Sequence, residues 1–396
     1  MNTNECKILV VEDNQMMRKM LESMLMGLGY RNCCSAVDGV DAWDKIQAGD
    51  VDIVLCDYLM PGMNGLELLR HIRQTKQFCD MPFIMITGAD KRSDLMRSIQ
   101  AEVDYYLIKP PNIAQLAELL KNAVTRLKNP SDFDKFMSRG KYYFLNAELD
   151  EALRHFEMAR LVHPDSALPY YYLGLTYLQL NNEKNAELNF KKSLIIESQF
   201  ISSLLALADI YQVRGDHANL EGCLAKVMEV LPDAFDIQIG LARACTRSGN
   251  MERAALHLSS AQQLAKNNAE QIQEVLDCYI EAGLLDEADL LFGRKVQDDD
   301  NEKTILFLNR LGVRARKMKN FEKAKFYYTS CLKLDPQNKN VNYNLATLFF
   351  LQKDYVAAES YLRKILRSHT DFQEAQELMD AIQQRRPDTK HNTEGR

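Results

Sequence analysis

Three acidic residues and one lysine occupy positions where they could form a reactive site. Glu12 and Asp13 follow one short apolar run, Asp57 ends another, and Thr87 and Lys109 follow two more. Carboxylates gathered at one place repel each other, which makes it costly to keep all of them ionised. A divalent cation relieves this repulsion, and a mixture of carboxylate, water and backbone oxygen ligands suits Mg²⁺. These residue types fit phosphoryl transfer, which depends on positioning and charge neutralisation.

Five short apolar runs must position these residues. They lie at 7–11, 32–36, 52–56, 82–86 and 105–108, and amphipathic helical patterns alternate with them over residues 1–128. This alternation predicts an α/β fold with a doubly wound, parallel five-stranded sheet. In such sheets ligands bind beyond the carboxyl ends of the strands. We therefore expect the acidic residues, the threonine and the lysine to meet at one edge of the sheet.

Four motifs around these residues occur in a characteristic order. They are VVEDN, CDYLMPGMNGLELL, MITGA and DYYLIKP. Together they resemble the motifs of CheY-like receiver domains of response regulators. The resemblance implies a flavodoxin-like receiver over residues 1–128 and a part in bacterial two-component signalling. It also implies that a sensor histidine kinase or a phosphotransfer protein supplies the phosphoryl group.

The resemblance assigns a role to each residue of the expected site. Asp57 is the phosphoacceptor, and Mg²⁺ is held by Glu12, Asp13, Asp57 and the backbone carbonyl of Leu59. Lys109 supplies a second positive charge. Such a protein is not an enzyme in the usual sense, beyond self-catalysed transfer and loss of its own phosphoryl group.

A second set of implied roles concerns signal propagation. Thr87 assists at the phosphoryl group and forms a switch pair with Tyr106, whose ring fills the space left when the threonine loop moves inward. The bond between Lys109 and Pro110 resembles the cis peptide of the family. Pro111 departs from the bulky apolar residue that is usual there.

From residue 133 onward a 34-residue period replaces the alternation of strands and helices. Small residues, turn positions and bulky positions each recur in the same register. The small positions are Ala152, Ala186, Leu220 (a larger exception), Ala254 and Ala288, and the turn positions are Ala147, Asn181, Gly215, Gly249 and Gly283. This pattern is similar to tetratricopeptide (TPR) repeats, in which stacked units share one continuous core.

The repeats predict an all-α, superhelical TPR solenoid. An insertion around residues 302–304 resets the register, and two further units bring the total to seven over 133–372. With a capping helix the domain extends over 133–384, after a short linker at 129–132. Residues 385–396 form a polar tail that we expect to be disordered.

The first helix of each unit would form the concave wall of the solenoid. The residues predicted to face it are Phe144, Tyr171, Leu175, Leu178, Arg243, Asp277, Arg316, Tyr343 and Phe350. An apolar and aromatic end that passes into mixed charge suits an extended or helical peptide of a partner protein. An equally open interpretation is that some of these aromatic residues are core between paired helices.

Composition restricts the possible functions. With 49 Lys and Arg against 55 Asp and Glu, the 396-residue chain has a net charge of −6, which argues against a nucleic-acid binder. The 17 Gly and 10 Pro are few for this length and indicate a helix-rich protein. No apolar stretch is long enough to span a membrane and no leader pattern begins the sequence, so we expect a cytoplasmic protein.

Three functions are compatible with these patterns. In the first, phosphorylation of Asp57 changes how the repeats bind a protein. In the second, the receiver is a docking surface of a scaffold that never switches. The third is an output enzyme or DNA-binding regulator, which the absence of a basic stripe or a helix-turn-helix pattern disfavours. A further alternative is that Glu12 and Asp13 merely cap a helix.

Overall fold

The computed structural model describes residues 5–88, 103–295 and 301–385. The chain divides into two compact units, Met1–Ile237 and Gln238–Arg396. The first unit holds the α/β domain and the first three helix pairs that follow it. The predicted α/β domain therefore belongs to the same compact unit as the beginning of the repeats.

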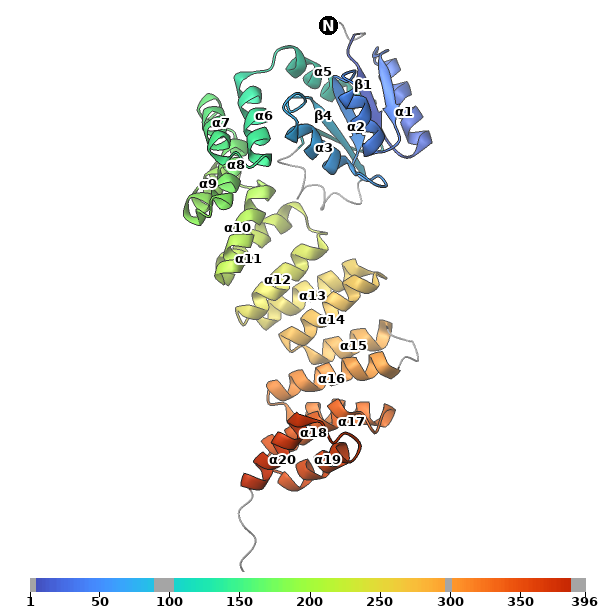
Figure 1. Cartoon of the computed structure of the whole chain (residues 1–396), viewed down its shortest axis with the longest axis vertical. Helices are drawn as coiled ribbons and strands as arrows, with labels where there is room; N and C mark the ends of the chain where they lie inside the picture. Colours follow the sequence, from blue (N-terminus) through green and yellow to red (C-terminus); the bar gives the residue numbers. More distant parts are fainter. Residues whose placement is uncertain (1–4, 89–102, 296–300, 386–396) are drawn as a thin grey trace, which may run out of the picture. The chain divides into compact units, whose positions relative to one another are not determined.

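A parallel sheet of five strands forms the centre of the α/β domain among the described residues (Figure 1). The strands are β1 (Ile8–Val11), β2 (Cys33–Ala36), β3 (Ile53–Asp57), β4 (Phe83–Gly88) and β5 (Tyr105–Lys109). Their order in the sheet is β2-β1-β3-β4-β5, and every neighbouring pair is parallel. This confirms the predicted doubly wound sheet and all five predicted strands.

The sheet is buried on both faces, which explains why its central strands are apolar throughout rather than alternating. One face contributes to a core with α2 (Gly39–Gln47) and α3 (Gly65–Gln74), and the other to a core with α1 (Gln15–Gly27) and α5 (Ile113–Lys128). The first core includes Leu9, Val11, Val54, Cys56, Phe83 and Met85, and the second includes Ile8, Val10, Ile53, Leu55, Ile84 and Ile86.

Each of these four helices begins after an Asn or Asp whose side chain accepts hydrogen bonds from the first turn, the favoured way to satisfy exposed backbone N–H groups. The capping residues are Asn14, Asp38, Asn64 and Asn112. The helix predicted between β4 and β5 lies outside the described residues.

Consecutive helices in antiparallel pairs follow the α/β domain, consistent with the predicted TPR array. Within the described residues the pairs are α6 (Asp132–Leu145) with α7 (Leu149–Val162), α8 (Ala167–Gln179) with α9 (Glu183–Ile196), α10 (Ile201–Arg214) with α11 (His217–Val230), α12 (Phe235–Arg247) with α13 (Met251–Ala265), α14 (Ala269–Ala282) with α15 (Leu285–Lys295), α16 (Asn301–Lys317) with α17 (Phe321–Leu334), and α18 (Lys339–Leu351) with α19 (Tyr355–Ser368). A final helix, α20 (Gln373–Arg385), covers the last pair.

Glycines on the first helix of a pair make room for an aromatic ring from the second. A Cβ atom added to Gly140, Gly174 or Gly312 would lie 2.5 Å from a ring carbon of Phe156, Phe190 or Tyr328, respectively. These rings are fully buried. In these three pairs, the glycine of the first helix and the aromatic ring of the second helix are therefore packing partners.

The turns inside the pairs also follow the 34-residue register. Ala147, Asn181, Gly215, Gly249 and Gly283 all have positive φ, between 56° and 82°. This left-handed conformation ends a helix and suits glycine best. It accounts for the turn positions that the sequence pattern indicated.

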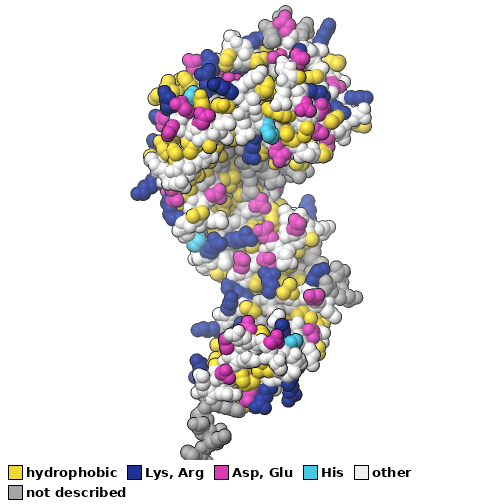
Figure 2. All heavy atoms as spheres, in the orientation of Figure 1, with side chains coloured by type: hydrophobic (Ala, Val, Ile, Leu, Met, Phe, Trp, Pro, Cys, Tyr) yellow, Lys and Arg dark blue, Asp and Glu magenta, His cyan; other side chains and the backbone are white. Residues whose placement is uncertain are grey.

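Charged side chains of both signs are mixed on the surface that Figure 2 shows, where Lys and Arg are interspersed with Asp and Glu. No helix within the described ranges has the length and apolar character that a membrane crossing requires. The nine cysteines are free thiols, each buried or half-buried.

Candidate functional site

The three predicted acidic residues meet at the carboxyl edge of the sheet. β1 pairs with β3, so Glu12 and Asp13, directly after β1, lie beside Asp57 at the end of β3. Carboxylate oxygens from the three side chains lie within 4.8 Å of one another. Glu12 and Asp57 are buried, whereas Asp13 is exposed. The cluster therefore opens to solvent on the Asp13 side.

Lys109 reaches the same cluster from the end of β5. Its Nζ lies 2.9 Å from Oε2 of Glu12 and 3.0 Å from Oδ1 of Asp57. The lysine side chain is 22% exposed, more than either carboxylate. One ammonium group thus bridges two buried carboxylates and neutralises part of their charge.

Burial sets the electrostatics of the cluster. It raises the pKa of Glu12 and of Asp57, because ionised carboxylates lose hydration, while the bond to Lys109 acts in the opposite direction. Burial alone would lower the pKa of Lys109, but its bonds to Glu12 and Asp57 outweigh this effect and raise it. The site therefore has negative charge in excess of the single ammonium, and a cation beside Asp13 would be favoured.

Local backbone contacts hold the acidic residues in place. The Arg18 guanidinium donates to the backbone carbonyl of Glu12 at 2.5 Å and more distantly to that of Asp13. The Tyr58 N–H donates to Oδ1 of Asp57 at 2.9 Å. Gly65, the first residue of α3, packs so closely that an added Cβ would lie 2.3 Å from the Asp57 carbonyl oxygen. The end of β3 is thus fixed by the start of α3.

The donor set fits Mg²⁺. It consists of carboxylate oxygens alone, two of them held in position by the fold and one exposed, as expected for a cation that prefers oxygen ligands and retains several waters. Leu59, whose carbonyl was expected to complete the set, lies in the loop after β3 with a half-exposed side chain, and its role remains a prediction.

Comparisons with known proteins agree with this arrangement. Residues 8–121 match the family described as response regulator receiver domain. Chemotaxis protein CheY-3 of Vibrio cholerae is 39% identical over 121 residues, which are 31% of this chain and 93% of that protein. CheY1 of Helicobacter pylori is 36% identical over 116 residues, covering 29% of this chain and 94% of that protein.

The chain belongs to the response regulator receiver family.

Two further similarities concern the repeats and the solved structures. Residues 315–382 match the tetratricopeptide repeat family, so the C-terminal helix pairs are TPR repeats. Among solved structures, the receiver domain of a Pseudomonas aeruginosa sensor histidine kinase, determined with magnesium coordinated in its active site cleft, is 31% identical. That similarity covers 30% of this chain and 97% of that structure, with a TM-score of 0.28.

The expected switch residues of the receiver lie on neighbouring strands. Thr87 on β4 is buried, and its hydroxyl makes a long 3.5 Å contact with the Gly88 carbonyl. Tyr106 on β5 is 45% exposed. The peptide bond between Lys109 and Pro110 is cis, as the resemblance implied. The switch role of Thr87 and Tyr106 remains a prediction.

The predicted groove residues of the first repeats line two hollows. Phe144, Tyr171 and Leu175 line a small cavity whose other wall includes Leu69 and Arg70 of α3. Tyr171, Leu175 and Leu178 also line an open groove between α8 and α10. Part of the predicted concave surface thus faces the receiver itself, and part is open.

The later predicted groove residues lie in the second unit, on α12, α14, α16 and α18. Arg243 pairs with Glu274 at 3.1 Å. Asp277 pairs with Arg310 at 2.8 Å, and Arg316 is half-buried. Tyr343 and Phe350 pack against the C-terminal core, where their rings contact Phe372 and Tyr355. Packing between helices accounts for these two aromatic residues, and their part in partner binding remains a prediction.

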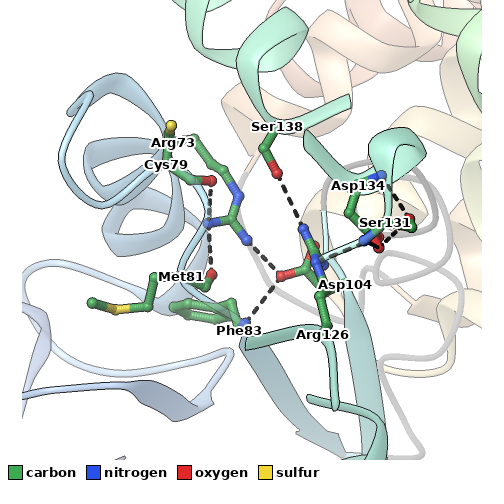
Figure 3. A network of polar contacts seen from close by, with 9 residues as sticks. All are labelled: Arg73, Cys79, Met81, Phe83, Asp104, Arg126, Ser131, Asp134 and Ser138. Carbon is green, nitrogen blue, oxygen red and sulfur yellow. Dashed lines mark hydrogen bonds and ion pairs between the residues drawn. The ribbon is translucent and has the colours of Figure 1, made fainter. Parts of the chain in front are cut away.

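Sequence reasoning missed a buried ionic cluster at the opposite end of β5 (Figure 3). Asp104, just before β5, accepts from Arg73 and Arg126 at 2.6 Å each, and from the Phe83 N–H at 3.0 Å. Burial would raise the pKa of Asp104, but the two guanidinium groups and the ammonium of Lys141 hold it at about 2. The cluster joins α3 to β5 and α5, which follow it in sequence by about 30 residues or more, and no motif indicated it.

Proposed function

We propose that this protein is a two-component response regulator in which Asp57 accepts a phosphoryl group and thereby alters protein binding by the TPR array. The observation that supports this most strongly is the contact of Lys109 with both Glu12 and Asp57, beside the exposed carboxylate of Asp13. A sensor histidine kinase or a phosphotransfer protein would be the donor, and the cytoplasm would be the compartment.

The residues divide the chemistry between them. An oxygen of Asp57 attacks phosphorus, forming a covalent acyl phosphate while the donor leaves. Lys109 stays near the transferred group and balances its added charge. The Thr87 hydroxyl donates to a phosphoryl oxygen, and Tyr106 follows its movement. Glu12 and Asp13 hold Mg²⁺ together with Asp57 and the Leu59 carbonyl, and the bound ion supplies charge neutralisation for the transferred group.

The repeats supply the output in this proposal. The open groove lined by Tyr171, Leu175 and Leu178 on α8 and by residues of α10 is mainly apolar, with Glu183 and Asp209 as charged residues in its lining. Such a groove suits an apolar peptide segment of a partner protein. The proposal includes no catalysis beyond transfer and loss of the phosphoryl group.

Acetyl phosphate, a small phosphodonor, tests the phosphoacceptor directly. We expect the full-length protein to gain the mass of one phosphoryl group in the presence of Mg²⁺ and none with EDTA. Asp57→Ala should gain none, whereas Asp44→Asn, which changes an exposed aspartate on α2, should behave as wild type. Wild-type protein that stays unmodified would favour the alternative, a scaffold whose receiver only docks a partner.

A further inference from the structure

The first repeat helix, α6, is attached to the receiver by polar contacts near both of its ends. Arg126 of α5, which bonds Asp104, also donates to Ser138 at 3.2 Å and lies 3.5 Å from Asp134 (Figure 3). Near the other end of α6, the Asn146 side chain donates to the backbone carbonyl of Gln74 at 3.2 Å. Helix α6 is therefore packed on the receiver along its length, beyond its covalent connection.

Helix α3 runs from the acid cluster to this junction. Its first residue, Gly65, packs against the Asp57 carbonyl and donates its N–H to the Tyr58 carbonyl at 3.1 Å. Its end carries Arg73 and Gln74, which contact Asp104 and α6. A helix of this length is a stiff rod of about 15 Å.

Strand β5 makes the same connection independently. Asp104 precedes it at the junction, and Lys109 ends it at Glu12 and Asp57. The ionic cluster at its start is costly to break, because removing one partner leaves a buried charge without compensation. Helix α3 and strand β5 thus both connect the acid cluster to α6. The buried ionic cluster around Asp104 lies where the two elements meet α6.

We propose that the junction of α6 with the receiver is energetically coupled to Asp57 through α3 and β5. This inference rests on the proposed function, because phosphorylation is the event that would act at Asp57. A shift of the acid cluster on phosphorylation changes the packing of α6, and therefore the start of the repeat array. Coupling of this kind is reciprocal, so a change at the junction must also alter binding at Asp57.

Two substitutions weaken the junction without touching the acid cluster. Arg126→Lys keeps a positive charge beside Asp104 but loses the planar fork that reaches Asp134 and Ser138. Ser138→Ala removes one acceptor and serves as the milder second variant. Lys135→Ala is the matched control on the same helix, since the half-exposed Lys135 side chain forms its ion pair with the nearby Asp132, at 3.2 Å, within α6 itself.

The readouts are two equilibrium quantities measured on the full-length chain. One is the affinity for beryllium fluoride, a phosphoryl mimic, with Mg²⁺; the other is hydrogen exchange of α6 with and without the mimic. We expect Arg126→Lys to change the affinity about 2-fold or more, Ser138→Ala to change it less in the same direction, and Lys135→Ala to leave it unchanged. In wild type, exchange in α6 should change when the mimic binds.

The outcomes separate the two proposals. If wild type binds the mimic but α6 exchange does not respond and both junction variants bind like wild type, the coupling is wrong and the phosphoacceptor proposal stands. If Lys135→Ala alters the affinity as much as Arg126→Lys, the effect is not specific to the junction and the coupling is again wrong. If wild type neither binds the mimic nor is phosphorylated by acetyl phosphate, the proposed function itself fails.

Discussion

At the scale of single residues, Lys109 and Asp104 mark the two ends of β5 with opposite electrostatic situations. Lys109 is one cation facing several carboxylates, so its site has an unsatisfied negative charge. Asp104 is one carboxylate facing two guanidinium groups, and its site is closed by protein alone. The first arrangement suits a site that binds and releases ligands, and the second suits an ionic contact that stabilises the fold.

Lys109→Ala should slow phosphorylation of Asp57 by acetyl phosphate about 10²-fold, the typical cost of losing one preorganised charge beside a reacting group. Intact-mass kinetics measure the rate. Lys45→Ala is the control, because Lys45 also pairs with a carboxylate, that of Asp41, but on the surface of α2. Equal rates for wild type and Lys109→Ala would contradict the assigned role of Lys109.

Asp104→Asn should destabilise the first unit by about 3–5 kcal/mol at neutral pH, since the buried Arg73 loses its counter-charge and the partly buried Arg126 loses the nearer of its two carboxylate partners. The native pKa of Asp104, about 2, lies below its ordinary value of 3.8. Its stabilising effect is therefore complete above pH 3.8 and is lost as the pH falls through about 2. The difference in unfolding free energy between wild type and Asp104→Asn should shrink over this interval.

The single tryptophan makes this measurement possible. Trp43 on α2 packs against His71 of α3 and against Phe78, so its fluorescence during urea unfolding reports on the receiver. A difference that stays constant from pH 4 down to pH 2 would show that Asp104 is not held ionised by its partners.

At the scale of elements, contact between the start of α3 and the end of β3 places Asp57. The close approach is possible because Gly65 has no Cβ. Of the three nearest atoms, two are backbone atoms of Asp57, which cannot turn aside as the third, the side-chain sulfur of Met85, could. The geometry of the phosphoacceptor therefore depends on a residue that takes no part in the chemistry.

Gly65→Ala should force α3 and β3 apart and destabilise the receiver by about 1–3 kcal/mol, as overpacking commonly does. Gly27→Ala is the matched control, because the added methyl group at the end of α1 meets no atom within 4 Å. That control should be neutral or slightly stabilising, since alanine favours helix over glycine. Trp43 fluorescence during urea unfolding measures both variants, and equal midpoints for the two would refute this account.

The secondary-structure elements and the acid cluster could be predicted from the sequence where a known structural rule links sequence pattern to position. Glu12, Asp57 and Lys109 could be brought together because parallel strands place their carboxyl ends at one edge. The turn positions of the repeats followed from a strict period. The Asp104 cluster was not found, because Arg73, Asp104 and Arg126 belong to no motif and follow no periodic pattern.

The apolar face of α1 is buried only in part. Leu21 and Leu25 are buried, whereas Met16 is 82% exposed. The sheet covers a narrower part of the helix than the apolar pattern suggests. Periodicity shows which face of a helix is apolar, but the width of the covering surface decides how much of it is buried.

At the scale of the whole molecule, the receiver packs against the first repeat helix, α6, which lies beyond the end of its sequence pattern. The predicted boundary at residue 128 and linker at 129–132 remain predictions, but the receiver and the first helix pairs lie in one compact unit. Arg126, inside the predicted receiver, bonds Ser138, inside the predicted repeats. A receiver cut out at the predicted boundary therefore loses contacts that complete it.

A chain ending at residue 130 should be less stable by about 1.5–3 kcal/mol than the full-length receiver, because Arg126 loses its hydrogen-bonded partners on α6. Trp43 fluorescence in urea again gives the comparison. A chain ending at residue 237 is the control, since it retains the whole first unit and should unfold with the full-length midpoint. Equal midpoints for the shorter chain would show that α6 adds nothing to the receiver.

The free thiols of the repeats have a practical consequence. Cys223, Cys245, Cys278 and Cys331 are buried on α11, α12, α14 and α17, and burial raises the pKa of Cys278 and of Cys331 to about 11. Alkylating reagents attack exposed thiolates, so each cysteine stays protected until its own helix pair opens. The order in which these four thiols are alkylated would reveal the order in which the repeats open, without any introduced label.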